Sequence, residues 1–333
     1  MKDFAGKIAF ITGGACGAGF GQAQIFAEAG MKVVIADVRQ DHIDEAMEYF
    51  KKTGAPVHAI RLDVTDRAGY AAAADETERV FGSSPDLLVL TAGVNAFGPV
   101  EASTFEDFDW VMGVNLGGVI NGLVTFVPRM IKAGRGGYVA ATVSYGAFGA
   151  TPFVAPYTAS KMAVLNLLES YWQALKPYGI GVSALCPANI NSRIYEAAIK
   201  TRPESLKNTG YNVSEETQAV LAVTNKTGID PRDLAESLKR GIETETFLVI
   251  PYPSAARMVE IDMRRFADYT SPEGMKRLEE RKKQPPTEEQ KQIFREKEGY
   301  EMDQAPEAPQ GPDVGFGKAR KDLDWVAPEN RAK

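Results

Sequence analysis

Short apolar runs alternate with longer amphipathic segments along the first three quarters of the chain. The runs are rich in Val, Ile and Leu, which is typical of buried strands. The amphipathic segments place apolar residues at steps of three and four, the period of an α-helix. The predicted strands are 7–14, 32–38, 57–64, 86–93, 137–144, 181–186 and 246–253. The predicted helices are 20–29, 41–52, 67–81, 105–133 and 157–176.

Strands separated by helices require crossover connections, which are right-handed and produce a parallel sheet. The pattern therefore predicts an α/β fold: a single doubly wound Rossmann-type domain over residues 1–253, with a parallel sheet of the seven predicted strands.

Residues 254–333 should form a C-terminal extension of this domain. The stretch 254–283 reads as one charged amphipathic helix that Pro285 and Pro286 end, and 303–312 is rich in proline and acidic residues. Such a composition does not build a core alone. Because Phe316, Trp325 and Val326 follow, both a solvated tail and an arm packed on a neighbouring subunit stay open, and we favour the arm.

Composition excludes several classes of function. The 38 Lys and Arg against 44 Asp and Glu give a net charge of −6, so neither nucleic acid nor an anionic membrane is an expected partner. We expect a soluble cytoplasmic protein, since no long apolar run occurs and a predicted strand follows Met1 too closely for a signal peptide. Neither the two cysteines nor the two histidines have the spacing of a metal site or a catalytic triad, so no metal is predicted; they are Cys16, Cys186, His42 and His58.

Tyr157 and Lys161 lie four residues apart in a predicted helix, so their side chains share one face. An ammonium ~4 Å from a phenol, at an effective dielectric constant of ~20, favours the phenolate by ~4 kcal/mol, or roughly three pK units. Such a phenol can act as a base near neutral pH. Ser144 ends a predicted strand, at the sheet edge where ligands bind in open α/β folds. A surface tyrosine beside an ordinary lysine gives the same pattern, so other motifs must decide.

A glycine-rich turn joins the first predicted strand to the first helix and reads TGGACGAG from Thr12 to Gly19. Glycines at such a turn let the backbone approach a pyrophosphate at the helix amino terminus. About twenty residues later Asp37 closes the second strand, where a carboxylate bonds the ribose hydroxyls and repels a 2′-phosphate. Ordinary turn glycines and a capping aspartate are the structural alternatives. We predict NAD as the cofactor, with Arg39 as a residue that could instead reach a phosphate.

Together these motifs resemble the short-chain dehydrogenase/reductase family over about residues 4–253. The family spacing TGxxxGxG is present as Thr12, Gly13, Gly17 and Gly19, and YxxxK and the family serine as Tyr157, Lys161 and Ser144. The resemblance implies that Ser144 and Tyr157 hold an alcohol, that Tyr157 takes its proton while hydride passes to the nicotinamide, and that Lys161 lowers the tyrosine pKa and bonds the nicotinamide ribose. It implies Asn115 as a fourth catalytic residue that holds a water against Lys161. An amide that satisfies a helix kink is the alternative for Asn115.

The same resemblance implies further contacts and an assembly. Asp63 is the expected adenine contact, and the other expected cofactor residues, besides Tyr157 and Lys161, are Val64, Ala92, Gly93, Pro187, Ile190 and Ser192. A homodimer or homotetramer would form through the helices that begin near Phe105 and Tyr157.

Two family motifs depart from their usual residues. NNAG reads Leu90-Thr91-Ala92-Gly93, so an amide that usually secures the fourth strand is absent, and packing is the expected substitute. The PG motif after the sixth strand reads Pro187-Ala188, and Ser192 replaces the usual Thr while keeping a hydroxyl.

The segments AFITGGACGAGFGQA, GVNLGGVINGLVTFVPRMI and VIPYP are similar to those of the NAD-dependent Cα-dehydrogenases of bacterial lignin β-aryl ether breakdown. This narrower resemblance implies oxidation of a benzylic secondary alcohol to a ketone. Residues in loops after the strands would line an aromatic site, and 188–228 is an insertion long enough to act as a lid. Each of these aromatics has a core or interface role as its alternative. The predicted substrate residues are Asn95, Phe97, Tyr145, Phe153, Asn189 and Tyr195.

Two rival functions remain open from the sequence. One is an NADPH-dependent carbonyl reductase or hydroxysteroid-type dehydrogenase, against which Asp37 weighs. The other is a protein that binds NAD without turnover, against which the four intact catalytic residues weigh.

Overall fold

The computed structural model describes residues 1–299 except 208, 213–214 and 253–254. Its centre is a parallel sheet of seven strands in the order β3-β2-β1-β4-β5-β6-β7. The strand order reverses between β1 and β4, which creates the crevice where ligands bind in open α/β sheets. The predicted doubly wound α/β fold is confirmed. The strands are β1 (Ile8–Thr12), β2 (Lys32–Asp37), β3 (Val57–Arg61), β4 (Leu87–Leu90), β5 (Gly137–Thr142), β6 (Ile180–Leu185) and β7 (Leu248–Val249).

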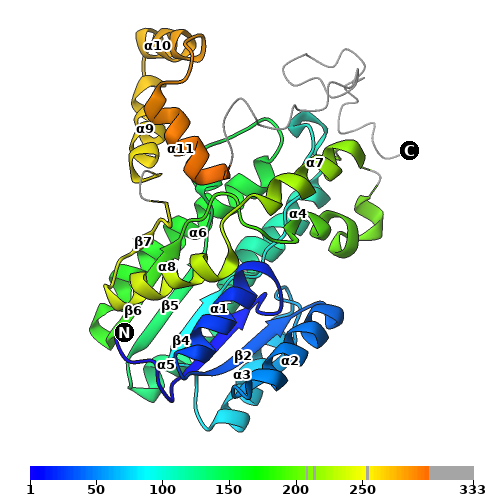
Figure 1. Ribbon diagram of the computed structural model, residues 1–333, viewed down its shortest axis with the longest axis vertical. Coiled ribbons are helices and arrows are strands. Elements are labelled where there is room, and N and C mark those ends of the chain that lie inside the picture. Colours follow the sequence, from blue (N-terminus) through cyan, green and yellow to red (C-terminus); the bar gives the residue numbers. More distant parts are fainter. Residues whose placement is uncertain (208, 213–214, 253–254, 300–333) are drawn as a thin grey trace.

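Helices cover both faces of the sheet (Figure 1). One face packs against α1 (Gly17–Glu28), α2 (Gln40–Thr53) and α8 (Pro231–Glu243), and the other against α3 (Arg67–Phe81), α5 (Gly118–Ala133) and α6 (Ala155–Ala174). Alternate strand residues serve the two faces, as strand geometry requires. In β1, for example, Phe10 points to the second layer and Ile11 to the first.

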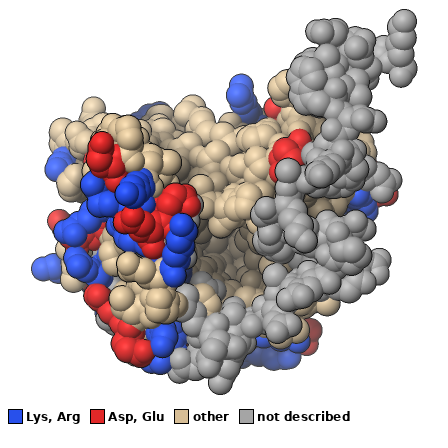
Figure 2. All heavy atoms as spheres, turned by 90° about the horizontal axis from the view of Figure 1, so that it is seen from above, with Lys and Arg blue, Asp and Glu red and all other residues tan. Residues whose placement is uncertain are grey.

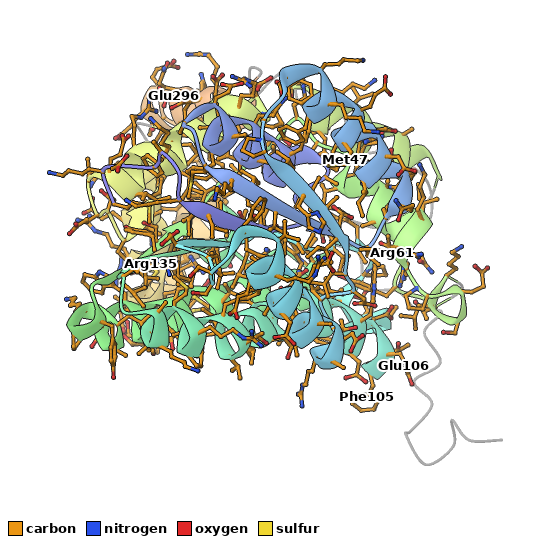
Figure 3. The ribbon with its side chains drawn as sticks, turned by 90° about the horizontal axis from the view of Figure 1, so that it is seen from below. Met47, Arg61, Phe105, Glu106, Arg135 and Glu296 are labelled. Atoms are coloured by element: carbon orange, nitrogen blue, oxygen red, sulfur yellow. The ribbon has the colours of Figure 1, made fainter. Side chains whose placement is uncertain are left out.

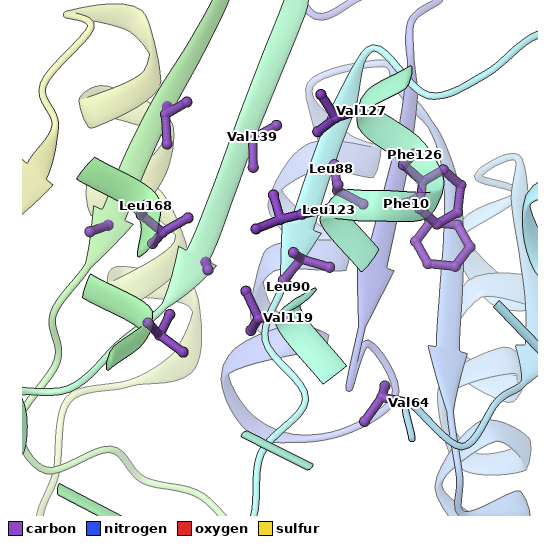
Figure 4. Packing of buried hydrophobic residues seen from close by; sticks show 14 of the residues in the cluster. Phe10, Val64, Leu88, Leu90, Val119, Leu123, Phe126, Val127, Val139 and Leu168 are labelled. Carbon is purple, nitrogen blue, oxygen red and sulfur yellow. The ribbon is translucent and has the colours of Figure 1, made fainter. Parts of the chain in front are cut away.

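The larger core cluster fills the space between the sheet and α3, α5 and α6 (Figure 4). Phe10 of β1 meets Phe126 of α5 with ring centroids 4.4 Å apart, and Leu88, Leu123 and Val139 continue the packing. These strands are buried on both faces, which explains why the sequence shows continuous apolar runs rather than alternation.

The predicted helix 105–133 is present, but a π-helical turn interrupts it. The turn, Gly113–Gly117, separates α4 (Phe105–Met112) from α5. The stretch Phe105–Ala133 is long and apolar enough to span a membrane by length and composition alone. Because Val119, Leu123 and Phe126 lie in the core, we assign it as a core helix.

The insertion after β6 is structured and closed at its base. Ile190 and Ile229 form an isolated parallel bridge, in which Asn191 N donates to Ile229 O over 3.0 Å. Just after this bridge, a Cβ on Gly21 of α1 would lie 2.3 Å from the Pro231 carbonyl oxygen, so only glycine permits this contact between α1 and α8. Short turns and α7 (Glu215–Lys226) lie between Ile190 and Ile229.

A buried ion pair joins the insertion to α4. The Arg202 guanidinium donates to Asp107, and the two side chains are 3% and 1% exposed. Arg202 also donates to Tyr211 O over 3.0 Å, while Asp107 takes part in a capping box with Thr104. The charge pair therefore holds the insertion over the start of α4.

The predicted single helix 254–283 is wrong. The chain forms α9 (Ala255–Asp268) and α10 (Pro272–Lys282), with Ser271 in an extended conformation between them. Proline at a first helical position disfavours helical geometry in the residue before it, and Ser271 caps α10 by accepting from Gly274 N over 3.0 Å. A further helix, α11 (Glu288–Glu298), follows Pro285 and Pro286. The expectations for 303–312, Phe316, Trp325 and Val326 lie outside the described residues.

Replacing Arg202 with Met should lower the unfolding free energy by about 3–5 kcal/mol, because the Asp107 carboxylate would stay buried without a cation. Adding Asp107→Asn should restore at least half of the loss, since the amide carries no charge and can still take part in the cap. Urea unfolding followed by circular dichroism measures both.

The matched control is Arg232→Met, which breaks an ion pair with Glu28 whose side chains are 42% and 52% exposed. It should cost less than about 1 kcal/mol. Equal losses for the two Arg→Met variants would contradict a special role for the buried pair.

Candidate active site

The glycine-rich turn after β1 has the geometry of a phosphate cradle. Gly13 has a φ of +64°, and a Cβ there would lie 2.9 Å from the Ala92 backbone. A Cβ on Gly19 would lie 2.1 Å from Gly13 O, so the turn folds on itself. Helix α1 begins here without a side-chain cap and without an acidic residue in its first turn. Its first N–H groups can therefore donate hydrogen bonds to an anion such as a pyrophosphate.

Asp37 ends β2 beside this turn. Its carboxylate accepts hydrogen bonds from Arg39 N over 3.1 Å and from Ala15 N over 3.4 Å. Burial raises the pKa of the carboxyl group, and the backbone N–H groups oppose that rise. The structure thus places the predicted ribose-binding carboxylate against the predicted phosphate turn.

Ser144, Tyr157 and Lys161 converge beyond the carboxyl end of β5. Ser144 Oγ accepts from Gly146 N over 3.0 Å, and its side chain lies close enough to the Tyr157 phenol to lower the pKa of that group. Lys161 Nζ donates to Thr142 O over 2.9 Å and lies 5.6 Å from the centroid of the Tyr157 ring. The α6 register predicted from YxxxK is therefore present.

The pKa of Tyr157 does not follow the prediction. We expected the Lys161 ammonium to lower it, but burial of the phenol raises it, and the nearby Ser144 side chain only partly opposes this. Burial also lowers the pKa of Lys161 from 10.5 to about 8. The ammonium faces the Thr142 carbonyl rather than the phenol oxygen, so desolvation dominates both groups.

Asn115 lies in the π-helical turn and is fully buried. Its Oδ1 accepts from Val94 N over 2.8 Å, and its Nδ2 donates to Val94 O and Ser160 Oγ, each over 3.0 Å. A Cβ on Gly93 would lie 3.3 Å from Asn115 Oδ1 and 3.6 Å from Lys161 Nζ. Asn115 therefore fixes the loop after β4 next to the lysine, and its role in holding a water stays a prediction.

Hydroxyl groups replace the missing amide of the fourth strand. Thr91 Oγ1 donates to Gln22 Oε1 over 2.7 Å and pairs with Thr142 Oγ1 over 2.8 Å. Thr12 Oγ1 accepts from Thr91 N over 3.1 Å and from Ala92 N over 3.2 Å. Packing was the expected substitute, and the finding is a hydrogen-bond network. The sequence signal was a polar residue within each of several apolar segments.

The loop after β6 lies over the glycine-rich turn. A Cβ on Gly17 would be 3.0 Å from Ser192 Cβ, and Tyr145 N donates to Pro187 O over 2.7 Å. This places Ser192 beside Gly17 of the predicted cofactor site and Pro187 beside Tyr145, while Ile190 lies in the bridge to Ile229. Asp63 is exposed and accepts from Thr65 N over 2.9 Å, while Val64 packs against Gly118. The adenine contact of Asp63 stays a prediction.

The predicted substrate residues differ in what they contact. Asn189 has a structural use, because its Nδ2 donates to Thr224 O over 2.7 Å at the base of the insertion. Phe97 and Phe153 flank a contact that Tyr211 organises, since the buried Tyr211 hydroxyl donates to Ala96 O and Phe153 O over 3.1 and 2.9 Å. Tyr211 was not predicted. Asn95 and Tyr195 are partly buried.

Tyr145 connects the site to the C-terminal helices. Its hydroxyl donates to Asp262 of α9, and Lys297 Nζ of α11 lies 3.9 Å from its ring centroid. Figure 2 shows the molecule hollowed beside charged residues, and the walls of the hollow are largely free of Lys, Arg, Asp and Glu.

The family model for short chain dehydrogenases matches residues 7–203. A C alpha-dehydrogenase of Sphingobium sp. (strain NBRC 103272 / SYK-6) is 49% identical over 272 residues, which are 82% of this chain and 89% of that protein.

Two solved structures are similar to most of this chain. The apo form of LigD from Sphingobium sp. strain SYK-6 has a TM-score of 0.68 at 44% identity and covers 81% of this chain and 100% of its own. A short chain dehydrogenase/reductase from Burkholderia phymatum in complex with NAD has a TM-score of 0.74 at 32% identity and covers 81% and 96%. With its glycine-rich turn and its Ser144, Tyr157 and Lys161 in the arrangement described above, this chain belongs to the short-chain dehydrogenase family.

Proposed function

We propose that the protein oxidises a secondary alcohol with an aryl group on the carbinol carbon to the corresponding ketone, using NAD. The observation that carries the proposal is the convergence of Ser144, Tyr157 and Lys161 at the sheet edge beside the glycine-rich turn, with Lys161 Nζ 5.6 Å from the centroid of the Tyr157 ring. This arrangement offers two hydroxyl groups to one substrate oxygen.

The residues present fit a nicotinamide dinucleotide. The turn from Gly13 to Gly19 and the uncapped start of α1 would hold the pyrophosphate, and Asp37 would bind the adenosine ribose. When bound, the nicotinamide ring supplies the hydride acceptor. A carboxylate at the ribose favours NAD over NADP.

The chain's own residues supply position and proton transfer. Ser144 donates to the substrate oxygen and orients it, and Tyr157 Oη takes the hydroxyl proton. The Lys161 ammonium stabilises the phenolate form of Tyr157 that takes this proton and becomes the neutral phenol, since burial otherwise penalises the phenolate. Asn115 keeps the loop after β4 in place beside Lys161.

Two observations support an aryl substrate. The relative from Sphingobium is named a C alpha-dehydrogenase. The hollow of Figure 2 has largely uncharged walls, and an uncharged lining suits a phenyl ring. Tyr145 and Phe148 lie within four residues after Ser144, and their rings meet edge to face with centroids 6.1 Å apart.

We also infer a cytoplasmic homodimer or homotetramer whose subunits pack through the helices that begin near Phe105 and Tyr157, namely α4 with its continuation α5, and α6. Phe105 is 83% and Val124 62% exposed on these helices, and Phe105 points away from the body of the molecule (Figure 3). Apolar side chains so exposed are typical of subunit interfaces.

Replacing Tyr157 with Phe should lower kcat by at least about a thousandfold while NADH binding changes little, because only the proton acceptor is removed. NADH formation at 340 nm with a benzylic alcohol measures turnover, and NADH fluorescence measures binding. The matched control is Tyr178→Phe, whose side chain is 51% exposed. Retained turnover in the Tyr157 variant would refute the catalytic assignment.

Replacing Lys161 with Met should abolish turnover yet stabilise the free protein by about 2 kcal/mol at pH 7. Lowering the lysine pKa from 10.5 to about 8 on folding destabilises the folded wild type by ~3 kcal/mol below pH 8, and the variant is relieved of this cost. The variant also loses the hydrogen bond to Thr142 O, which costs it ~1 kcal/mol. Between pH 8 and 10.5 the unfolded wild type binds more protons than the folded one, so its stability rises with pH and the advantage of the variant shrinks.

Urea unfolding at pH 7 and pH 9.5 measures this difference. A Lys161→Met variant that is less stable than the wild type at pH 7 would show that burying the Lys161 ammonium does not destabilise the folded protein. Lys176→Met, in the turn after α6, is the control for the same change at an unburied lysine.

A further inference from the structure

The guanidinium of Arg39, two residues after Asp37, is already bound by two carboxylates. Arg39 Nε donates to Asp41 over 3.0 Å, and Arg39 Nη1 donates to Glu196 over 2.7 Å. The Arg39 side chain is only 12% exposed, although it sits at the start of a surface helix. Its guanidinium is therefore sequestered beside the ribose-binding carboxylate, where a 2′-phosphate would lie.

Glu196 comes from the insertion after β6, 157 residues from Arg39 in the chain. Its carboxylate is 13% exposed, also binds Lys200 over 2.9 Å, and lies 4.0 Å from His42 Nε2. Burial raises the pKa of Glu196, but the hydrogen bonds from Arg39 and Lys200 outweigh it, so the pKa falls below its usual range. The group is therefore an anion at neutral pH.

The charges around the Arg39 guanidinium disfavour the 2′-phosphate of NADP. Asp41 and Glu196 both pair with the Arg39 guanidinium, so this cation offers little net attraction to a dianion. The nearby Arg193 pairs with Glu45 over 2.8 Å, and Arg61 Nε donates to Val38 O over 3.4 Å. Asp41 is 58% exposed and can be displaced by solvent, whereas Glu196 is held in a fixed turn of the insertion.

We propose that Glu196 is a specificity-determining residue that enforces NAD over NADP by occupying the Arg39 guanidinium. The proposal rests on the nicotinamide site described above and adds a residue to it that the sequence motif does not contain. A carboxylate from the insertion thereby completes the selection that Asp37 begins.

The test compares four proteins with the wild type: Glu196→Gln, Arg39→Gln, the double variant, and Glu204→Gln. Glu204 lies in the same insertion but pairs with Lys207 over 2.7 Å, so it controls for loss of one negative charge. Fluorescence titration with NADH and with NADPH, without any alcohol, gives both dissociation constants. The readout is the ratio of the NADPH constant to the NADH constant.

In Glu196→Gln this ratio should fall about tenfold, because the freed guanidinium can pair with the 2′-phosphate. The double variant should return to the wild-type ratio, since it lacks the cation. Arg39→Gln and Glu204→Gln should leave the ratio within about twofold of the wild type.

Two results would overturn the proposal. The ratio in Glu196→Gln could stay unchanged, or the fall could persist in the double variant. An unchanged ratio with both dissociation constants raised would show that Glu196 only fastens the insertion to α2. A wild type that binds neither NADH nor NADPH would refute the proposed function itself, which separates the two failures.

Discussion

A short chain of buried hydrogen bonds ties the carboxyl ends of β1, β4 and β5 together, and the geometry of the site depends on it. Thr12 holds the backbone after β4, Thr91 joins Gln22 and Thr142, and the Thr142 carbonyl accepts from Lys161. Parallel strands end with unpaired backbone groups at this edge, so side chains must satisfy them. Because Thr12, Gln22, Thr142 and Lys161 are buried and Thr91 is partly buried, the network links the glycine-rich turn to Lys161 with little freedom to move.

The strands, most helices and the positions of Ser144, Tyr157 and Lys161 could be predicted because each depends on local pattern or short spacing. The helix 67–81 was predicted with its observed bounds. The contact between Gln22 and Thr91 spans 69 residues and follows from no local rule. The break before Pro272 was locally visible, but amphipathic periodicity masked it. The Tyr157 pKa was mispredicted since spacing gives proximity to Lys161 and not the degree of desolvation.

Two buried cations illustrate opposite uses of charge. Arg202 has the Asp107 carboxylate as its partner and serves to fasten the insertion. Among the described residues, Lys161 forms no ion pair with a carboxylate and rests on a carbonyl oxygen. An arginine in a pair contributes to structural specificity, whereas an unpaired lysine keeps its field available for a developing anion. The fold thus accepts local instability at Lys161.

The bridge between Ile190 and Ile229 has a consequence for how this chain can diversify. Main-chain hydrogen bonds hold the two ends of the insertion together, so a change in its length need not move Ser144, Tyr157 or Lys161. The entropy of closing a loop grows only with the logarithm of its length, by about 0.6 kcal/mol for each doubling. The insertion therefore behaves as an exchangeable module: segments of different size and lining can be joined to the same neck while the sheet edge stays unchanged.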